Sequence, residues 1–148
     1  MIKEKNAQFN VSHLPIIQCD RTLIGMVFYN MINNGIKFNR SSAPTVRVAS
    51  TNSHPDYYII SVIDNGIGIN QKYKDKIFEN YSRLASSDEF EGSGIGLSTT
   101  LNAVKKNKGN IWNDLISNFL TQFDQYSICR FRMDKANPFV VCSFFWLF

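Results

Sequence analysis

The chain has 148 residues, which suits a single domain with one hydrophobic core. Hydrophobic residues make up 44% of the sequence and charged residues 19%, so the composition is that of a globular protein and argues against a disordered chain or a fibrous repeat. Sixteen basic and twelve acidic residues give a net charge of +4, but the lysines are scattered, so we expect no nucleic-acid partner and leave an anionic ligand open.

The three cysteines, Cys19, Cys129 and Cys142, lie far apart and without a close cysteine or histidine pair. This pattern predicts neither a disulfide framework nor a zinc site, and it favours a reducing compartment. The first twenty residues lack the apolar core of a signal peptide, and no stretch approaches the roughly 20 apolar residues that cross a bilayer. We therefore expect a soluble, cytoplasmic chain with no membrane segment.

The first elements in chain order are a strand and a helix. Residues 7–11 alternate weakly, as an edge strand does, and the proline that follows marks a turn. Asp20 is a good N-cap for a helix with two distinct faces. The apolar face holds Ile24, Phe28, Met31, Ile32 and Gly35, and the polar stripe holds Asn30, Asn34 and Lys37.

Two strands are predicted next, over residues 44–50 and 56–64, with a turn-rich stretch between them. The second strand is apolar on both faces, with Tyr58, Ile60 and Val62 on one side and Ile59 and Ile63 on the other. A strand that is apolar on both faces is typical of the centre of a sheet.

The second half of the chain is less regular. Residues 71–84 predict a short helix and its exit, and residues 85–91 a polar loop. Residues 94–109 predict a helix with Leu97, Leu101 and Val104 at core spacing and Gly109 as its stop, before a strand that begins at 110–112.

Beyond Trp112 the pattern weakens. Residues 113–123 suit a helix and residues 126–133 a strand. The last eleven residues are almost wholly apolar yet too short for a transmembrane helix. They are either a buried strand or an aggregation-prone segment, and the sequence leaves both alternatives open.

Asp64 stands at the end of the predicted central strand and is followed by Gly66 and Gly68. A carboxylate at this place can accept a hydrogen bond from an amino group, and glycines let the backbone approach a flat ligand such as a purine. The alternative interpretation is a simple turn that closes a hairpin, and this motif alone supports both equally.

Two further clusters carry chemistry. Residues 92–96 form a glycine-rich loop before a helix, where exposed amides can receive phosphate oxygens, although a flexible linker has the same composition. On the first helix, Asn30, Asn34 and Lys37 share one face, so two amide oxygens can approach hydrated Mg²⁺ while the ammonium meets a phosphate. A solvated helix face is the alternative for this stripe.

Together these segments resemble the ATP-binding catalytic domain of sensor histidine kinases, in the superfamily that also holds gyrase, the Hsp90 chaperones and MutL. Residues 30–39 resemble the asparagine box, 64–69 the first glycine box, 77–84 the phenylalanine box and 92–97 the second glycine box, in family order and spacing. The lid region is most similar to that of kinases attached to phytochrome-type sensors. The resemblance implies an α/β two-layer sandwich, the Bergerat ATP-binding fold, with a mixed sheet packed on three main helices.

The resemblance also implies roles for individual residues. Asn34 would be the principal ligand of Mg²⁺ with Asn30 beside it, Lys37 would reach the phosphates, and Asp64 would accept from the adenine amino group. Arg83 would position the terminal phosphate, and with Asn30, Asn34 and Lys37 it forms the expected catalytic set. Phe78 and Tyr81 would anchor the base of the lid. The remaining residues expected to bind ATP are Phe38, Gly66, Gly68, Ile69, Gly92, Gly94, Gly96 and Leu97.

The residue at position 30 bears on the reaction. The gyrase and Hsp90 branches carry a glutamate there as a general base, whereas an amide cannot accept a proton near pH 7, so we expect slow hydrolysis. The resemblance implies transfer of the γ-phosphoryl group to a histidine on a separate dimerisation domain, with a response regulator downstream. Neither His13 nor His54 lies in a suitable helix, so we expect phosphorylation only in trans. The resemblance places the dimer interface chiefly on the separate helical domain, so we expect a monomer.

The resemblance stops near Trp112, because the family's further glycine box is missing and no glycine follows Gly109. We therefore divide the chain into an ATP-binding domain, residues 1–112, and an atypical segment, residues 113–148, that completes or replaces the last strands. A divergent tail and a frameshift or misread intron explain this loss equally well. A non-catalytic nucleotide-binding module and a truncated, inactive kinase fragment remain alternative functions.

Overall fold

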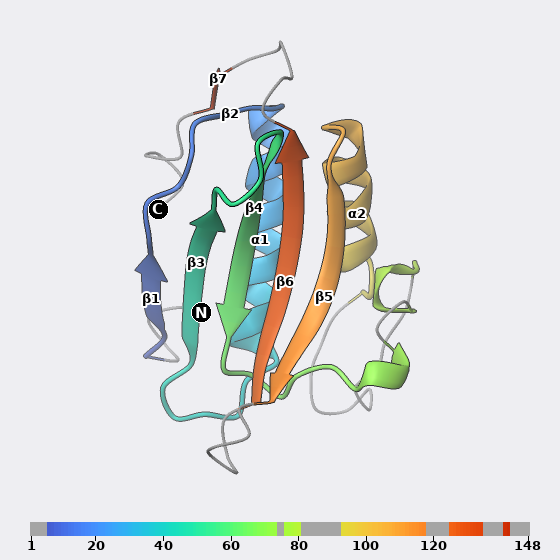
Figure 1. The fold of residues 1–148 in the computed structure, drawn as a ribbon. Coiled ribbons are helices and arrows are strands. Elements are labelled where there is room, and N and C mark those ends of the chain that lie inside the picture. The colour runs from blue at the N-terminus through green and yellow to red at the C-terminus, as the bar shows by residue number, and fades with distance from the viewer. Residues whose placement is uncertain (1–5, 74–75, 81–92, 118–124, 135–140, 143–148) are drawn as a thin grey trace.

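The computed structural model describes residues 6–73, 76–80, 93–117, 125–134 and 141–142. The elements in chain order are β1 (Gln8–Val11), β2 (Ile17–Gln18), α1 (Arg21–Lys37), β3 (Thr45–Thr51), β4 (Tyr57–Asp64), the 3₁₀ turns η1 (Gln71–Tyr73) and η2 (Lys76–Phe78), α2 (Gly96–Lys106), β5 (Asn110–Ser117), β6 (Gln125–Asp134) and β7 (Val141–Cys142). Both α-helices lie on the same face of one sheet (Figure 1).

The main sheet has the strand order β1-β3-β4-β6-β5. β1 runs parallel to β3, and every other neighbouring pair is antiparallel, so the sheet is mixed. The structure confirms β1 as an edge strand and β4 as a central one. Because β6 lies between β4 and β5, strands far apart in the sequence meet at the centre of the sheet.

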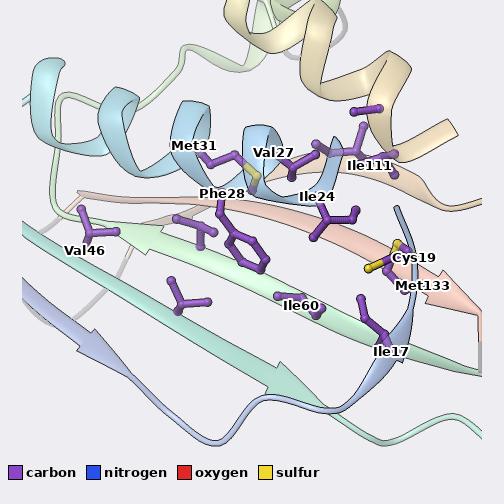
Figure 2. Packing of buried hydrophobic residues seen from close by; sticks show 14 of the residues in the cluster. Ile17, Cys19, Ile24, Val27, Phe28, Met31, Val46, Ile60, Ile111 and Met133 are labelled. Atoms are coloured by element: carbon purple, nitrogen blue, oxygen red, sulfur yellow. The ribbon is translucent and has the colours of Figure 1, made fainter. Parts of the chain in front are cut away.

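Helix α1 begins where the sequence predicts. The Asp20 side chain accepts a hydrogen bond from the Leu23 backbone N–H at 3.0 Å, which caps the first turn. The Phe28 ring projects from the helix onto the sheet, near the side chain of Ile60 on β4 (Figure 2). The buried face of α1 consists of Ile24, Val27, Phe28, Met31, Gly35 and Ile36, while the predicted member Ile32 is only partly buried.

Helix α2 packs against α1, and a hydrogen bond joins the C-terminal end of α2 to the N-terminal end of α1. The Asn107 side chain accepts a hydrogen bond from the Asp20 backbone N–H at 2.7 Å and donates to the Ala103 carbonyl. The helix starts two residues later than predicted. Val104 is fully buried, whereas Leu97 and Leu101 are only partly buried, because Thr100 and Ala103 occupy much of the inner face.

The mixed α/β architecture is confirmed, but the described residues contain two α-helices where three were expected. Within the predicted helix over 71–84, the described part forms the two short 3₁₀ turns η1 and η2. Ile77 of η2 is buried, and η2 packs beside α2. Ile77 anchors the described part of this segment, and a longer helix would need a repeating apolar face to hold it against the core.

The suggestion of a helix over 113–123 is wrong for its described part, because residues 113–117 continue β5. Each of them pairs with β6, from Asn113 opposite Cys129 to Ser117 opposite Gln125. Strand pairing over this length overrides a weak local helical pattern. β5 thus crosses residue 112, where the predicted domain boundary lies, and the division at that residue stays a prediction.

The C-terminal segment also reaches the start of the chain. Val141 and Cys142 of β7 pair antiparallel with Gln18 and Ile17 of β2 in a small second sheet. The other residues of the apolar tail lie outside the described part of the structure. No helix among the described residues is long and apolar enough to traverse a bilayer.

Candidate functional site

Asp64 ends β4 at the centre of the sheet, opposite Val46 of β3 and Ser127 of β6. Its carboxylate Oδ1 accepts a hydrogen bond from the Gly66 backbone N–H at 2.9 Å. Burial raises the pKa of Asp64 from 3.8 to about 6, against the opposing effect of the Gly66 hydrogen bond. A largely buried carboxylate whose Oδ1 accepts from one backbone donor can still accept from a ligand through Oδ2.

The turn after Asp64 rests on the C-terminal end of α1. The Ile67 backbone N–H donates to the Phe38 carbonyl at 2.9 Å. A Cβ at Gly66 would lie 2.5 Å from that same carbonyl oxygen, so no other residue fits without moving the backbone. Gly68 follows with a φ of 70°, in the left-handed region. The alternative of a hairpin turn is wrong, because the chain passes from this turn into η1, and the strands that pair with β4 in the described residues are β3, which precedes it, and the distant β6.

Gly35 brings α1 into direct contact with Asp64. A Cβ at Gly35 would lie 2.8 Å from the Asp64 Cβ and 3.2 Å from the Val46 Cγ2. The next residue toward the helix N-terminus is Asn34, whose side chain is partly exposed. The predicted base-binding carboxylate therefore lies against the helical turn that carries the predicted metal ligand. The sequence indicated Gly35 only as part of the apolar face.

Two asparagines that the sequence did not single out connect the same segments. The Asn39 Nδ2 donates to the Asn65 Oδ1 at 2.7 Å and to the Gly35 carbonyl at 3.3 Å. The Asn65 Oδ1 also accepts from the Thr45 backbone N–H at 2.7 Å. Asn39 is only 6% exposed. An amide pair thus joins the end of α1, the start of β3 and the turn after β4.

Asn30 connects α1 to the start of α2. Its Nδ2 donates to the Gly96 carbonyl at 3.2 Å and to the Thr100 Oγ1 at 3.4 Å. Thr100 in turn donates to the Gly96 carbonyl at 2.9 Å. The asparagine box and the second glycine box, 66 residues apart, are therefore in contact through this side chain.

The other predicted site residues have fewer described contacts with Asp64, Asn30 and Gly35. The Lys37 Nζ lies 4.9 Å from the centroid of the Phe38 ring, and both side chains are partly exposed at the end of α1. Gly94 has a φ of 70° and precedes α2. Ile69 and Leu97 are partly buried, as is Phe78, which packs against the core. Tyr81, Arg83 and Gly92 lie outside the described residues.

The donor set suits a metal held mainly by phosphates and water. Asn30 directs its Nδ2 to α2, which leaves its Oδ1 as an oxygen donor one helical turn before Asn34. Amide oxygens are hard donors of the kind that Mg²⁺ prefers. Among the described residues, no group of three or more histidines, cysteines or carboxylates gathers as an all-protein metal site would require. The residues present therefore fit Mg²⁺ that arrives with a nucleotide.

Neither histidine is placed as a phosphoacceptor in a helix. His13 is exposed after β1, and His54 lies in the connection between β3 and β4. The His54 ring stacks on Tyr57 with the two centroids 3.8 Å apart. Both positions agree with the prediction that neither histidine lies in a suitable helix.

Comparison with known families accounts for this arrangement. Residues 19–136 match the family described as histidine kinase-, DNA gyrase B- and HSP90-like ATPase. The chain belongs to this family. The match extends beyond Trp112 and includes β5 and β6, so the shared pattern covers the whole five-stranded sheet except β1.

The similar curated proteins include phytochromes and sensor kinases. The chain is 33% identical over 111 residues to phytochrome-like protein Cph1 of Synechocystis sp., which is 75% of the chain and 15% of that protein. It is 30% identical over 122 residues to sensor histidine kinase WalK of Bacillus subtilis, 78% of the chain and 20% of WalK. The chain thus spans about a fifth or less of these relatives, and it is an ATP-binding catalytic domain of the sensor histidine kinase type.

Solved structures of the ATPase family have the same fold. The mycobacterial sensor histidine kinase MprB superposes with a TM-score of 0.76 at 21% identity, over 90% of this chain and 85% of MprB. Full-length ShkA in complex with AMPPNP superposes with a TM-score of 0.70 at 21% identity, over 95% of this chain and 27% of ShkA. These likenesses confirm the mixed α/β fold.

Proposed function

We propose that the chain binds Mg²⁺ and ATP between Asp64, α1 and the start of α2, and that it transfers the γ-phosphoryl group to a histidine on a separate domain. The observation that carries this proposal is the position of α1. Its Gly35 contacts Asp64, its Asn34 lies beside that contact, and its Asn30 reaches Gly96. One helix thus brings together the residues proposed for base, metal and phosphate.

Asp64 is the proposed acceptor for the adenine amino group. Its Oδ1 already accepts from Gly66, so we assign the amino group to Oδ2. Ionised carboxylates accept hydrogen bonds from neutral donors more strongly than amides do. The base stays near the backbone because Gly66 and Gly68 carry no side chain at this turn.

The start of α2 is the proposed place of the phosphates. Its N-cap residue, Ile95, makes no side-chain hydrogen bond to the first turn, which leaves backbone N–H groups for an anion. The helix dipole adds a partial positive charge at this end. Lys37, at the end of α1, supplies a full positive charge for the phosphate chain.

Asn34 and Asn30 are the proposed ligands of Mg²⁺, through their Oδ1 atoms. When bound, Mg²⁺ would neutralise phosphate charge and orient the terminal phosphoryl group. Asn30 also holds Gly96, so one side chain would serve both the metal and the second glycine box. As an amide it cannot remove a proton from water, which favours an incoming histidine over hydrolysis.

The acceptor would be a histidine on a helical partner domain, whose ring nitrogen forms a bond to the γ-phosphorus as the bond to the ADP oxygen breaks. One similar solved structure is histidine kinase ThkA in complex with response regulator protein TrrA. By analogy, we infer that a response regulator acts downstream of this chain. A monomeric state and a cytoplasmic location stay predictions.

The proposal is tested by transfer in trans. The chain is incubated with magnesium, γ-labelled ATP and a separately expressed helical phosphoacceptor domain of a sensor histidine kinase. We expect label on the acceptor that is stable in alkali and lost in acid, as phosphohistidine is, and little free phosphate. Binding of ATP without any transfer would favour the alternative of a regulatory nucleotide-binding module. Absence of ATP binding at millimolar concentration would contradict the proposal.

A further inference from the structure

The amide pair of Asn39 and Asn65 has no assigned role among the predicted site residues. Asn39 is nearly inaccessible, and its amide contacts the two segments that meet at the site. Its Nδ2 reaches the carbonyl of Gly35, the residue that contacts Asp64. Its partner, Asn65, is the residue directly after Asp64. The pair therefore connects α1 with the turn after β4 next to the contact between Gly35 and Asp64.

Each end of the pair is fixed by further backbone contacts. The Asn39 Oδ1 accepts from the Ser41 backbone N–H at 2.8 Å. The Asn65 Oδ1 accepts from the Thr45 backbone N–H, and its Nδ2 donates to the Ala43 carbonyl at 3.4 Å. Both side chains thus donate and accept hydrogen bonds at once, and so form one connected polar network. A network of this kind fixes backbone position better than one contact does.

The turn after β4 depends on this network for its position. The Asn65 backbone N–H donates to the Thr45 carbonyl at 3.3 Å, and the next N–H, that of Gly66, orients the Asp64 carboxylate. Without the Asn65 side chain, the hydrogen bonds that the described residues still give this turn are backbone bonds to Thr45 and to Phe38. A small rotation of the Gly66 peptide would release the Asp64 Oδ1 and let the carboxylate turn.

We propose that Asn39 and Asn65 are positioning residues, which hold the Asp64 carboxylate in the orientation that selects the amino group of adenine. The inference rests on the proposed binding of ATP at this site. It assigns the pair to base selectivity and not to phosphate affinity, because the network touches the turn after β4 and makes no contact with α2 in the described residues.

The test compares ATP with purine riboside triphosphate, which lacks the amino group, by calorimetric titration in the presence of magnesium. The wild-type chain should bind ATP about tenfold more tightly than the analogue, the value of one well-placed hydrogen bond to a charged group. Asn65→Ala should lower the affinity for ATP about tenfold, whereas its affinity for the analogue should stay within about twofold of the wild-type value. Asn10→Ala, at an exposed position on β1, is the matched control and should keep the wild-type preference.

Asn39→Ala provides a second, milder variant, since the Asn65 bond to Thr45 remains in it. It should also reduce the preference for ATP over the analogue. The double variant should show the same preference as Asn65→Ala alone, as expected for two residues that act as one unit. If Asn65→Ala shows no cooperative melt, Asn39→Ala alone decides the result.

Two results in the variants would overturn the inference. An equal loss of affinity for both nucleotides would show a merely structural role, and an unchanged preference for ATP would show no role in selectivity. Failure of the wild-type chain to bind either nucleotide would overturn the proposed function and the inference together. The wild-type titration therefore separates failure of the function from failure of the positioning role.

Discussion

At the scale of single residues, Asp64 decides how the chain should respond to pH. Its pKa is raised to about 6 because the carboxylate is buried, and only the ionised form keeps both oxygens as acceptors, Oδ1 for the Gly66 N–H and Oδ2 for the proposed adenine amino group. Nucleotide affinity should therefore fall as the pH drops through 6, and it should be constant above about 7.

We predict that the affinity for ATP at pH 5 is about tenfold lower than at pH 7.5, since about a tenth of Asp64 is then ionised. Calorimetric titration at both values tests this. Asp64→Asn serves as the control, because its amide does not titrate while the phosphates of ATP titrate as before. A wild-type profile that matches the variant's would show that Asp64 is not the titrating group.

The same pKa has a consequence for stability. A carboxyl with a raised pKa binds its proton more tightly in the folded than in the unfolded chain, so this group's contribution to the free energy of unfolding falls as the pH rises from about 4 to about 6. Above pH 6 the ionised carboxylate lowers the free energy of unfolding of the nucleotide-free chain by about 3 kcal/mol, compared with a carboxyl of unshifted pKa. The residue proposed to bind the base thus weakens the fold that carries it.

Asp64→Asn should therefore stabilise the nucleotide-free chain by about 1 to 3 kcal/mol at pH 7.5, and by much less at pH 4. The asparagine Oδ1 can still accept from Gly66. Urea unfolding at the two pH values measures the difference. A loss of stability at pH 7.5 would mean that the carboxylate is held by favourable contacts that outweigh its burial.

Residue types indicated part of the candidate site from the sequence alone. Asp64, Gly66 and Asn34 stand in short motifs whose chemistry can be read locally. Asn39 and Asn65 do not, because their role arises from a contact between side chains 26 residues apart. An asparagine after a helix suggests a cap, and one in a turn suggests the turn itself, so neither position signals a shared network.

At the scale of elements, α1 organises the site through its small residue at position 35. The helix approaches β4 closely only because Gly35 leaves room for the Asp64 side chain. Strong periodicity made α1, β3 and β4 predictable from the sequence. The described parts of 71–84 and 113–123 form 3₁₀ turns and a strand where helices were predicted, because the local patterns there are short and tertiary contacts decide their form.

We predict that Gly35→Ala destabilises the chain by about 1 to 3 kcal/mol and weakens ATP binding, since the new methyl would force α1 away from Asp64 and Val46. Gly25→Ala in the same helix is the matched control. It should stabilise the chain by up to about 1 kcal/mol through helix propensity. Thermal melts and ATP titration of both variants measure these effects. Wild-type stability and ATP affinity in Gly35→Ala would contradict the close contact.

At the scale of the whole molecule, non-local strand pairing completes the fold. β6 enters between β4 and β5, and β7 reaches back to β2 near the start of the chain. Such pairings depend on the whole set of strands, which is why the sequence beyond Trp112 gave a weak prediction. The assembled sheet supports β4 from both sides, so Asp64 projects from a rigid position toward α1.

The central claim is that Asp64 faces the base and Asn34 faces the metal of one nucleotide. Calorimetric titration of ATP with and without Mg²⁺, on the wild-type chain, Asp64→Asn and Asn34→Ala, tests it most directly. We predict that Asp64→Asn weakens binding about tenfold in both conditions, whereas Asn34→Ala abolishes the gain from Mg²⁺ and leaves metal-free binding unchanged. Wild-type affinities in both variants, with and without the metal, would contradict the claim.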